Sequence, residues 1–465
     1  MKQKPSFIFI IVMAGLAAFG PLSIDMYLPA LPQVADALHT STTQTQLILT
    51  FFMFGLALGN IIFGIVSDQT GRKRPLIVSL ILYIVFSIVC ALATHVELLI
   101  VARFIQGIAG GAGIVLSRAI ASDKYKGNEL TQFLALLMLV NGAAPVFAPM
   151  IGGVLTDHMS YHIIFYILAV LSILMFIGVL FKVDESLAKE YRSDAGFKPV
   201  FQDFRQLIQR QTFILPILIQ SLTFALFFSY MAASPFILQN IYHLTPQTYS
   251  YIFAFTGLGL IFTAQLTARF VKKMNAFKLF RSFSVIQLIG AIIVIVSLLN
   301  HASLWFLIPG FFLIVASVSG VATLGFSIAM DGQKKAVGSA SSLVGLLQYF
   351  VGAATTPLVG LMGERSFIPY LIVLIITLIL IFILHAVHIR HLKKHICKYI
   401  TTRFREVMNP LKVDFSLTFK IFFLAGWFHL YLIASSAFCT DSNSCFAAST
   451  QSPFAAVWNS IKKRH

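Results

Sequence analysis

The stretch of sequence that decides the fold runs from residue 46 to residue 94, QLILTFFMFGLALGNIIFGIVSDQTGRKRPLIVSLILYIVFSIVCALAT. Two apolar runs, residues 46–66 and 75–94, flank a short loop with three consecutive basic residues at positions 72–74. At about 1.5 Å of rise per residue, about twenty apolar residues cross the hydrocarbon core of a bilayer as a helix. The stretch therefore predicts two membrane-spanning helices joined by a basic loop.

Ten more apolar runs of similar length follow the same pattern. They cover residues 7–31, 98–119, 130–155, 163–181, 213–241, 249–271, 277–299, 304–330, 337–361 and 368–387. Of the 465 residues, 58% are hydrophobic and only 11% are charged, whereas about 25% of the residues of an average soluble domain are charged. This composition excludes a soluble enzyme, a secreted scaffold and a disordered chain. Because the runs are unbroken and do not alternate, they predict an all-α integral membrane protein with twelve transmembrane helices.

Basic residues alternate from one side of the predicted spans to the other. Gaps after even-numbered spans contain Lys and Arg, whereas Arg365 is the one basic residue in the gaps after odd-numbered spans. Basic loops stay in the cytoplasm, so the alternation predicts a cytoplasmic N-terminus and explains the net charge of +17 without nucleic acid. The polar interval 182–212 divides the spans into two sets of six. We expect an N-terminal half (1–181), a cytoplasmic linker (182–212), a C-terminal half (213–388) and a basic tail (389–465) with one extra apolar segment, 417–438.

Two charged residues, Asp25 and Arg103, stand well inside the predicted spans. A charge at mid-helix costs about 2.5–3.5 kcal/mol on insertion scales, and such residues usually face a cavity or each other. Counting from the span ends places both in the outer half of the membrane. One interpretation is a static ion pair that fixes helix packing. The other is that Asp25 carries a proton and that Arg103, close by, tunes its protonation.

The basic loop GIVSDQTGRKRP, residues 64–75, resembles the loop signature of the major facilitator superfamily. The matching positions are Gly64, Asp68, Gly71, Arg72 and Lys73. The resemblance implies that Gly64 permits close helix contact and that Asp68 forms a charge latch with the basic cluster on the inner face. Gln69 departs from the usual basic residue, and an ordinary cytoplasmic turn is the alternative interpretation.

Two further spans carry motifs similar to those of the superfamily. In ARFIQGIAGGAG, Arg103, Gln106 and Gly107 match a pattern whose arginine is thought to couple to the proton site of drug/proton antiporters. In NGAAPVFAPMIGG, residues 141–153, the matches are Pro149, Gly152 and Gly153, while Ala148 replaces a glycine. The second motif marks antiporters more than importers, and its proline would bend the helix beside a cavity. An ordinary kinked helix is the alternative.

The strings PLSIDMYLPALP (21–32), SRAIASD (117–123) and GSASSLVGLLQYFVGA (338–353) resemble the Bcr/CflA family of bacterial drug-resistance transporters. The resemblance implies a major facilitator fold in the bacterial inner membrane and alternating access. It also implies proton-coupled efflux of small amphipathic compounds related to bicyclomycin and chloramphenicol, by a monomer without a cofactor. Export of a metabolite such as an amino acid, sugar or siderophore by the same fold is the alternative. A membrane enzyme is disfavoured because the spans offer neither clustered acids nor a nucleophile with its base.

Polar and aromatic residues at mid-span are the candidate lining of a substrate cavity: Tyr27, Asn141, Gln220, Tyr230, Gln348 and Tyr349. Each could equally serve as an interhelical hydrogen bond. The expected partners are a small amphipathic substrate, protons and membrane lipids, with no nucleic acid. His385, His388, His391 and His395 recur at helical spacing, but we expect a basic helix at the anionic inner leaflet rather than a metal site.

Overall fold

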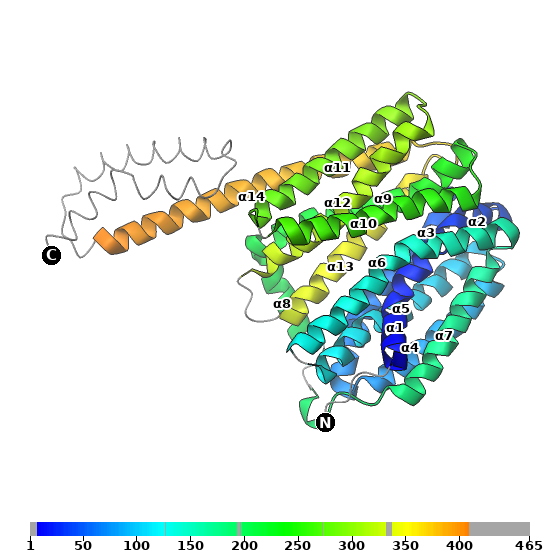
Figure 1. Ribbon diagram of the computed structural model, residues 1–465, viewed down its shortest axis with the longest axis horizontal. Coiled ribbons are helices and arrows are strands. Elements are labelled where there is room, and N and C mark those ends of the chain that lie inside the picture. Colours follow the sequence, from blue (N-terminus) through cyan, green and yellow to red (C-terminus); the bar gives the residue numbers. More distant parts are fainter. Residues whose placement is uncertain are drawn as a thin grey trace. The chain divides into compact units, whose positions relative to one another are not determined.

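The computed structural model describes residues 7–408, apart from residues 126, 193–195, 197, 272 and 332–336 (Figure 1). The first part of the chain forms α1 (Phe7–Asp25), the 3-10 turn η1 (Leu28–Ala30), α2 (Leu31–Ala37), α3 (Thr42–Thr70), α4 (Lys73–Leu92), α5 (Val96–Lys124), α6 (Gly127–His158) and α7 (His162–Lys182). The linker region holds η2 (Lys189–Tyr191) and α8 (Lys198–Gln209). The second part forms α9 (Gln211–Phe236), the π-helical turn η3 (Ile237–Ile241), α10 (Pro246–Phe270), α11 (Ala276–Leu299), α12 (Leu304–Met330), α13 (Val337–Thr355), the 3-10 turn η4 (Pro357–Gly360) and α14 (Ile368–Met408).

The helices confirm the prediction of an all-α membrane protein. Eleven helical segments in the described residues are long and apolar enough to cross a membrane. The fifth predicted span falls on α6, which has 32 residues. Hydropathy located the spans because a bilayer leaves few alternatives to a helix of about twenty apolar residues.

The loops begin and end these helices with local signals. Before α3, the side chain of Ser41 accepts a hydrogen bond from the amide of Gln44, and the Gln44 side chain accepts one from the amide of Ser41. This capping box satisfies amides that have no partner within the helix. Thr245 caps α10 in the same way, by accepting from the amide of Thr248.

The first predicted span is not one continuous helix, which corrects the sequence prediction. α1 ends at Asp25, and a 3-10 turn leads into the short helix α2. Pro29 and Pro32 have no amide hydrogen, so they cannot donate to the carbonyl groups of Asp25 and Leu28 four residues earlier. The carboxyl-bearing residue therefore stands at a helix break.

The twelfth span also differs, because α14 continues without interruption to Met408. The extra apolar segment 417–438 lies outside the described residues. By their contacts, Met1–His391 form one compact unit and Leu392–His465 another. The division of the spans into two six-helix halves stays a prediction.

Helix contacts within Met1–His391 place α1 against α5, α6 and α7, and α3 and α4 against α5. α12 packs against α9, α10 and α11, and α9 packs against α13. The helices of these two groups are called here the first set (α1–α7) and the second set (α9–α14). The pairs α6–α10 and α3–α13 bring the two sets together.

The contact between α3 and α5 is close because glycines alternate across it. A Cβ added at Gly59 would overlap the carbonyl oxygen of Ile108, and a Cβ at Gly107 would overlap that of Phe52. Small residues let membrane helices approach backbone to backbone, where van der Waals contact supplies the attraction. This approach holds Arg103, one turn before Gly107, against the ring of Phe52.

Candidate functional site

Arg103 on α5 is fully buried, and its guanidinium caps the broken end of α1. Nη2 donates a hydrogen bond of 3.0 Å to the carbonyl oxygen of Ser23, and Nη1 donates one of 2.7 Å to Oε1 of Gln106. The amide of Tyr27 bonds to Ile24 in a 3-10 turn, so the carbonyl of Ser23 is left without a helical donor. A cation at a helix C-terminus is stabilised by the helix dipole. Arg103 therefore supplies the donor that the carbonyl of Ser23 lacks at the break, and this carbonyl supplies an acceptor for the buried guanidinium.

Three aromatic rings surround the same guanidinium. Its central carbon lies 3.9 Å from the ring centre of Phe52, 5.2 Å from that of Tyr27 and 5.6 Å from that of Phe165. A ring face attracts a cation, and the attraction is largest where water is excluded. Nε of Arg103 has no hydrogen-bond partner. The arginine is thus held by a carbonyl, an amide and aromatic faces.

Gln106 extends the polar network to α4. Its Nε2 donates a 2.7 Å hydrogen bond to Oγ of Ser87, and the hydroxyl of Tyr83 on the same helix bonds to the hydroxyl of Ser23. The motif residues Arg103 and Gln106 therefore connect α5 to both α1 and α4.

Asp25 is buried, with 3% of its surface exposed, but it does not pair with Arg103. No ion pair joins the two side chains, which both lie in the described part of the chain. The interpretation of a static ion pair is therefore not met in this conformation, because the break at Asp25 gives the guanidinium the carbonyl of Ser23 instead.

The motif around Pro149 packs α6 against the same region. A Cβ at Gly152 would overlap the carbonyl oxygen of Met26, the residue after Asp25. A Cβ at Gly153 would overlap the hydroxyl of Ser250 on α10. Pro149 lies inside α6, one turn earlier. These glycines let α6 lie between the break in α1 and the first turn of α10.

The loop after α3 forms a compact set of charges around Arg72. Its Nη1 lies 2.5 Å from Oδ1 of Asp68 and 2.8 Å from Oγ of Ser67, and its Nε lies 3.1 Å from Oδ2 of Asp123 at the end of α5. Gly71 has φ of +98°, a conformation that glycine adopts without a steric penalty. The predicted neighbours Asp68 and Arg72 are thus brought together, while Lys73 donates to the carbonyl of Leu180.

Glu185, in the linker after α7, is a residue that the sequence interpretation missed. Its carboxylate accepts hydrogen bonds from the amides of Arg72 and Lys73 at the start of α4, and from the amide of Leu187. Burial by itself raises the pKa of Glu185, but these three amides and the charge of Arg192 outweigh it, so that the net effect lowers the pKa. Glu185 lies more than a hundred residues after the start of α4, so no local sequence pattern connects the two. The one signal in the sequence is an acidic residue in a basic linker.

Gly64 does not have the expected close contact. A Cβ at this position would meet only Cγ2 of Val115, at an ordinary 3.7 Å. The close backbone contact of α3 with α5 lies at Gly55 and Gly59, before Gly64 in α3.

The predicted cavity residues fall into several places. Tyr27 lies beside Arg103, and its hydroxyl has no hydrogen-bond partner. Tyr230 is buried among Phe253 and Phe311 and bonds to Thr256 at 2.9 Å. Gln220 is buried on α9, with Oε1 unpaired. Gln348 and Tyr349 are half-buried on α13, and the side chain of Asn141 lies outside the described residues.

Two of the histidines on α14 face α11. Nε2 of His385 lies 2.9 Å from Oγ of Ser284, and the ring of His388 stands edge-on to Phe277. Within the part of the chain that the structure describes, no group of three or more His, Cys, Asp and Glu side chains could hold a metal ion. The side chain of His395 lies outside the described residues.

Comparison with known proteins identifies several relatives. A family model described as Major Facilitator Superfamily matches residues 11–357. The MFS-type transporter YdgK of Bacillus subtilis is 34% identical over 370 residues, which cover 79% of this chain and 91% of that protein. The bicyclomycin resistance protein homolog of Haemophilus influenzae is 28% identical, with coverage of 80% and 94%. The multidrug resistance protein MdtL of Shewanella sp. is 27% identical, with coverage of 79% and 92%.

The fold also has solved counterparts. The crystal structure of a bacterial homolog of the human lysosomal transporter Spinster, in an inward-facing and unoccupied conformation, matches with a TM-score of 0.65 and 14% identity. The match covers 83% of this chain and 96% of that one. At this identity the likeness establishes the fold alone.

Proposed function

We propose, from the premise that this chain belongs to the major facilitator superfamily, that it exports small amphipathic compounds in exchange for protons. The family consists of transporters and not of enzymes, and the chain is a multi-pass membrane protein related to multidrug and bicyclomycin resistance proteins. We place it in the bacterial inner membrane as a monomer, with its N-terminus in the cytoplasm and alternating access between the two sides. The basic loops support this orientation.

The observation that carries the proposal is the position of Asp25. It is a buried carboxyl at a helix break, and the nearby arginine is occupied by Ser23 and Gln106. A carboxyl group inside a membrane must be protonated, paired or hydrated. With no ion pair to Arg103, the group that can neutralise Asp25 is a proton. We propose that Asp25 accepts this proton from one side and releases it to the other.

Arg103 has a positioning role in this proposal. It holds the carbonyl of Ser23 and so fixes the break that presents Asp25. Tyr27, beside Arg103, is the proposed substrate contact on this side, and we propose Tyr349 and Gln348 of α13 as substrate contacts from the second set. A proton that moves down 100 mV releases about 2.3 kcal/mol, enough for a substrate gradient of more than one decade.

The test is the substitution Asp25→Asn, assayed in everted vesicles by the efflux of an ethidium-like dye under an imposed proton gradient. Asparagine keeps the shape but cannot carry a proton. Because one proton at 100 mV supplies about 2.3 kcal/mol, more than one decade of gradient, we expect the substrate gradient built by proton-driven efflux to fall at least about tenfold. Glu97→Gln, an exposed carboxyl on the same protein, is the matched control and should transport normally. Efflux at the wild-type rate in Asp25→Asn would remove Asp25 from the mechanism.

Export of a metabolite remains the second candidate, because the antibiotic resistance relatives are less than 30% identical. A drug-susceptibility panel in an efflux-deficient bacterium, with and without a proton uncoupler, separates the two. Uncoupler-sensitive resistance supports drug export, whereas resistance to no compound supports the metabolite.

A further inference from the structure

Four aromatic rings of the second set lie together near the middle of their helices. Three are on α9 and one is on α13: Phe224, Phe227, Phe228 and Tyr349. Ring centres in contact lie between 5.5 and 6.3 Å apart, at interplanar angles from 29° to 85°. These four residues are called here the aromatic group.

The aromatic group is not fully covered by protein. Phe228 is buried, but Phe224, Phe227 and Tyr349 are only half-buried. From residue 213 to residue 238 of α9 and η3, no side chain reaches the exposure of a lipid-facing position, because packed helices surround this segment. The uncovered surface of the rings on α9 therefore opens toward the inside of the molecule.

One face of α13 changes from packed to open along the helix. In its outer part, a Cβ at Gly352 would overlap the ring of Phe228, and the hydroxyl of Thr356 bonds to that of Thr50 on α3. Gly345 lies on the same face, two turns nearer the inner end, and a Cβ there would meet no atom within 4 Å. The face that α9 and α3 cover in the outer part is therefore uncovered at Gly345.

Tyr349 stands beside this open space. It follows Gly345 by one turn, and a helical side chain leans over the turn that precedes it. Its ring contacts that of Phe228 at 6.0 Å. The open space is therefore bordered by an aromatic ring that belongs to the aromatic group.

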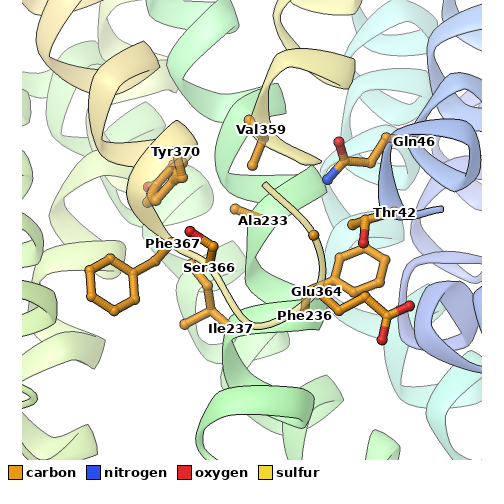
Figure 2. Close-up of a pocket in the computed structure, with 11 residues that line it drawn as sticks. Thr42, Gln46, Ala233, Phe236, Ile237, Val359, Glu364, Ser366, Phe367 and Tyr370 are labelled. Atoms are coloured by element: carbon orange, nitrogen blue, oxygen red, sulfur yellow. The ribbon is translucent and has the colours of Figure 1, made fainter. Parts of the chain in front are cut away.

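The outer end does not give access to this space. Gln46 of α3 donates a 3.3 Å hydrogen bond to the carbonyl of Ala232 on α9. The pocket beside this contact, drawn in Figure 2, has about 240 Å³ that is not filled by protein atoms, which is less than the roughly 300–1,000 Å³ of sites for drug-sized ligands. A ligand therefore reaches the aromatic group from the inner end, which is the cytoplasmic side in the predicted orientation.

The chemistry of the two helices determines which compounds can bind. Neither α9 nor α13 contains an acidic or basic residue, so they offer no partner for a localised charge. Aromatic rings attract a further ring in offset-stacked or edge-on contact, with centres about 4.5–7 Å apart. A sugar or a zwitterionic amino acid would lose water among these rings without partners for its hydroxyls or charges.

We infer that the aromatic group binds the planar aromatic ring system of the substrate, which enters from the cytoplasm. A localised charge is not needed, and a charge spread over the rings is tolerated. That the bound compound is then exported rests on the proposed function. The inference narrows the amphipathic compounds of that proposal to those with a flat aromatic ring, and it disfavours sugars and amino acids.

The first measurement compares competitors on the wild-type protein. Ethidium binding to the full-length transporter in lipid nanodiscs is followed by fluorescence anisotropy at pH 8, without a proton gradient. Acridine, which is planar, aromatic and uncharged at this pH, should displace ethidium. Tetrapropylammonium, an aliphatic cation, should not. Acridine that displaces ethidium no better than tetrapropylammonium does would overturn the inference.

The second measurement removes single rings. Tyr349→Leu and Phe227→Leu keep an apolar side chain but lose a ring, so each should weaken ethidium binding about two- to tenfold, the range measured for one aromatic pair. Tyr349→Phe keeps the ring and should retain most of the affinity. Phe350→Leu is the matched control, because this ring is 54% exposed and contacts Phe54 of α3 instead. Equal effects of Tyr349→Leu and Phe350→Leu would overturn the inference.

Gly345→Leu tests the open space itself. Because a Cβ at this position meets no atom, the variant should unfold at nearly the wild-type temperature, while the added side chain occupies the space beside Tyr349 and should weaken ethidium binding more than tenfold. Wild-type affinity in this variant would contradict the assigned position. Undiminished dye efflux in Asp25→Asn would overturn the proposed function alone, because these affinities are measured without transport.

Discussion

At the scale of single residues, Arg103 shows how a buried cation can be stable without a carboxylate. Five neighbours share the guanidinium: a backbone carbonyl, a glutamine amide and the rings of Phe52, Tyr27 and Phe165. Removing one partner of a buried ion pair leaves an uncompensated charge. Since Arg103 has no such pair here, Asp25 can gain or lose a proton without stranding the arginine. This independence is a property that a proton carrier needs.

Glu185 carries a prediction at the same scale. Replacing it by glutamine removes a charged acceptor from the first amides of α4, and loss of a helix cap typically costs about 1 kcal/mol. The side chain is exposed, so solvent screening keeps the effect at or below that value. We expect thermal unfolding in detergent at pH 7 to occur at a lower temperature in Glu185→Gln.

The pH dependence of this effect has a definite sign. The folded protein lowers the pKa of Glu185, so the stabilisation is present above the ordinary glutamate value of about 4.3 and is lost as the pH falls through the folded value. The difference between wild type and Glu185→Gln should therefore shrink below about pH 4.3. Glu190→Gln, in the same linker, is the control and should match wild type throughout. A Glu185→Gln difference that is constant down to pH 3 would contradict the cap.

At the scale of elements, the contact of α3 with α5 predicts different outcomes for two glycines on one helix. Gly59→Ala places a methyl group on the carbonyl of Ile108, whereas Gly64→Ala gains only an ordinary contact with Val115. Overpacking costs about 1–3 kcal/mol, so Gly59→Ala should unfold at a lower temperature. Gly64→Ala, the matched control, should stay close to wild type or gain slightly from the better helix propensity of alanine. Equal effects at the two positions would contradict the close approach around Gly59.

The helices also show which features of the fold and the site could be predicted from the sequence alone and which could not. The spans were predictable because an apolar run of membrane length has almost no alternative to a helix. The break after Asp25 arises because Pro29 and Pro32 have no amide hydrogen to donate to the carbonyls four residues earlier. Both prolines are visible in the sequence, but the prediction followed the continuous apolar run and made the span one helix. The sequence placed Asp25 and Arg103 at similar depth and left an ion pair between them as one interpretation, but depth says nothing about the rotation of a helix. Glu185 accepts a hydrogen bond from the amide of Arg72, which lies 113 residues earlier in the chain, and no local sequence pattern predicts a contact at that separation.

At the scale of the whole molecule, the proposed alternating access requires that contacts between the two sets of helices break and re-form. Three side-chain hydrogen bonds among the described residues join the two sets, from Gln46 to the carbonyl of Ala232, from Gln239 to that of Pro29 and between Thr50 and Thr356. The cluster of Asp68, Arg72 and Asp123 lies at the ends of α3 and α5 that are remote from Gln46 and Thr50. Three hydrogen bonds with a net worth of about 1 kcal/mol each amount to about 3 kcal/mol, the same order as the about 2.3 kcal/mol that one proton releases on moving down 100 mV. The proton gradient is therefore of a size that can shift this equilibrium in the proposed cycle.

The last prediction concerns the part of the chain beyond the compact unit Met1–His391. All the predicted spans, Asp25 and Arg103 lie within that unit, so removal of residues 392–465 should leave proton-driven dye efflux near the wild-type rate per molecule. The removed segment is rich in basic residues, and basic segments near a membrane bind the anionic leaflet. Its loss should therefore lower the amount of protein in the membrane rather than the rate of each molecule. The measurement is efflux from everted vesicles normalised to the transporter content. A truncated protein that is present at normal levels but does not transport would show that the cycle depends on the tail.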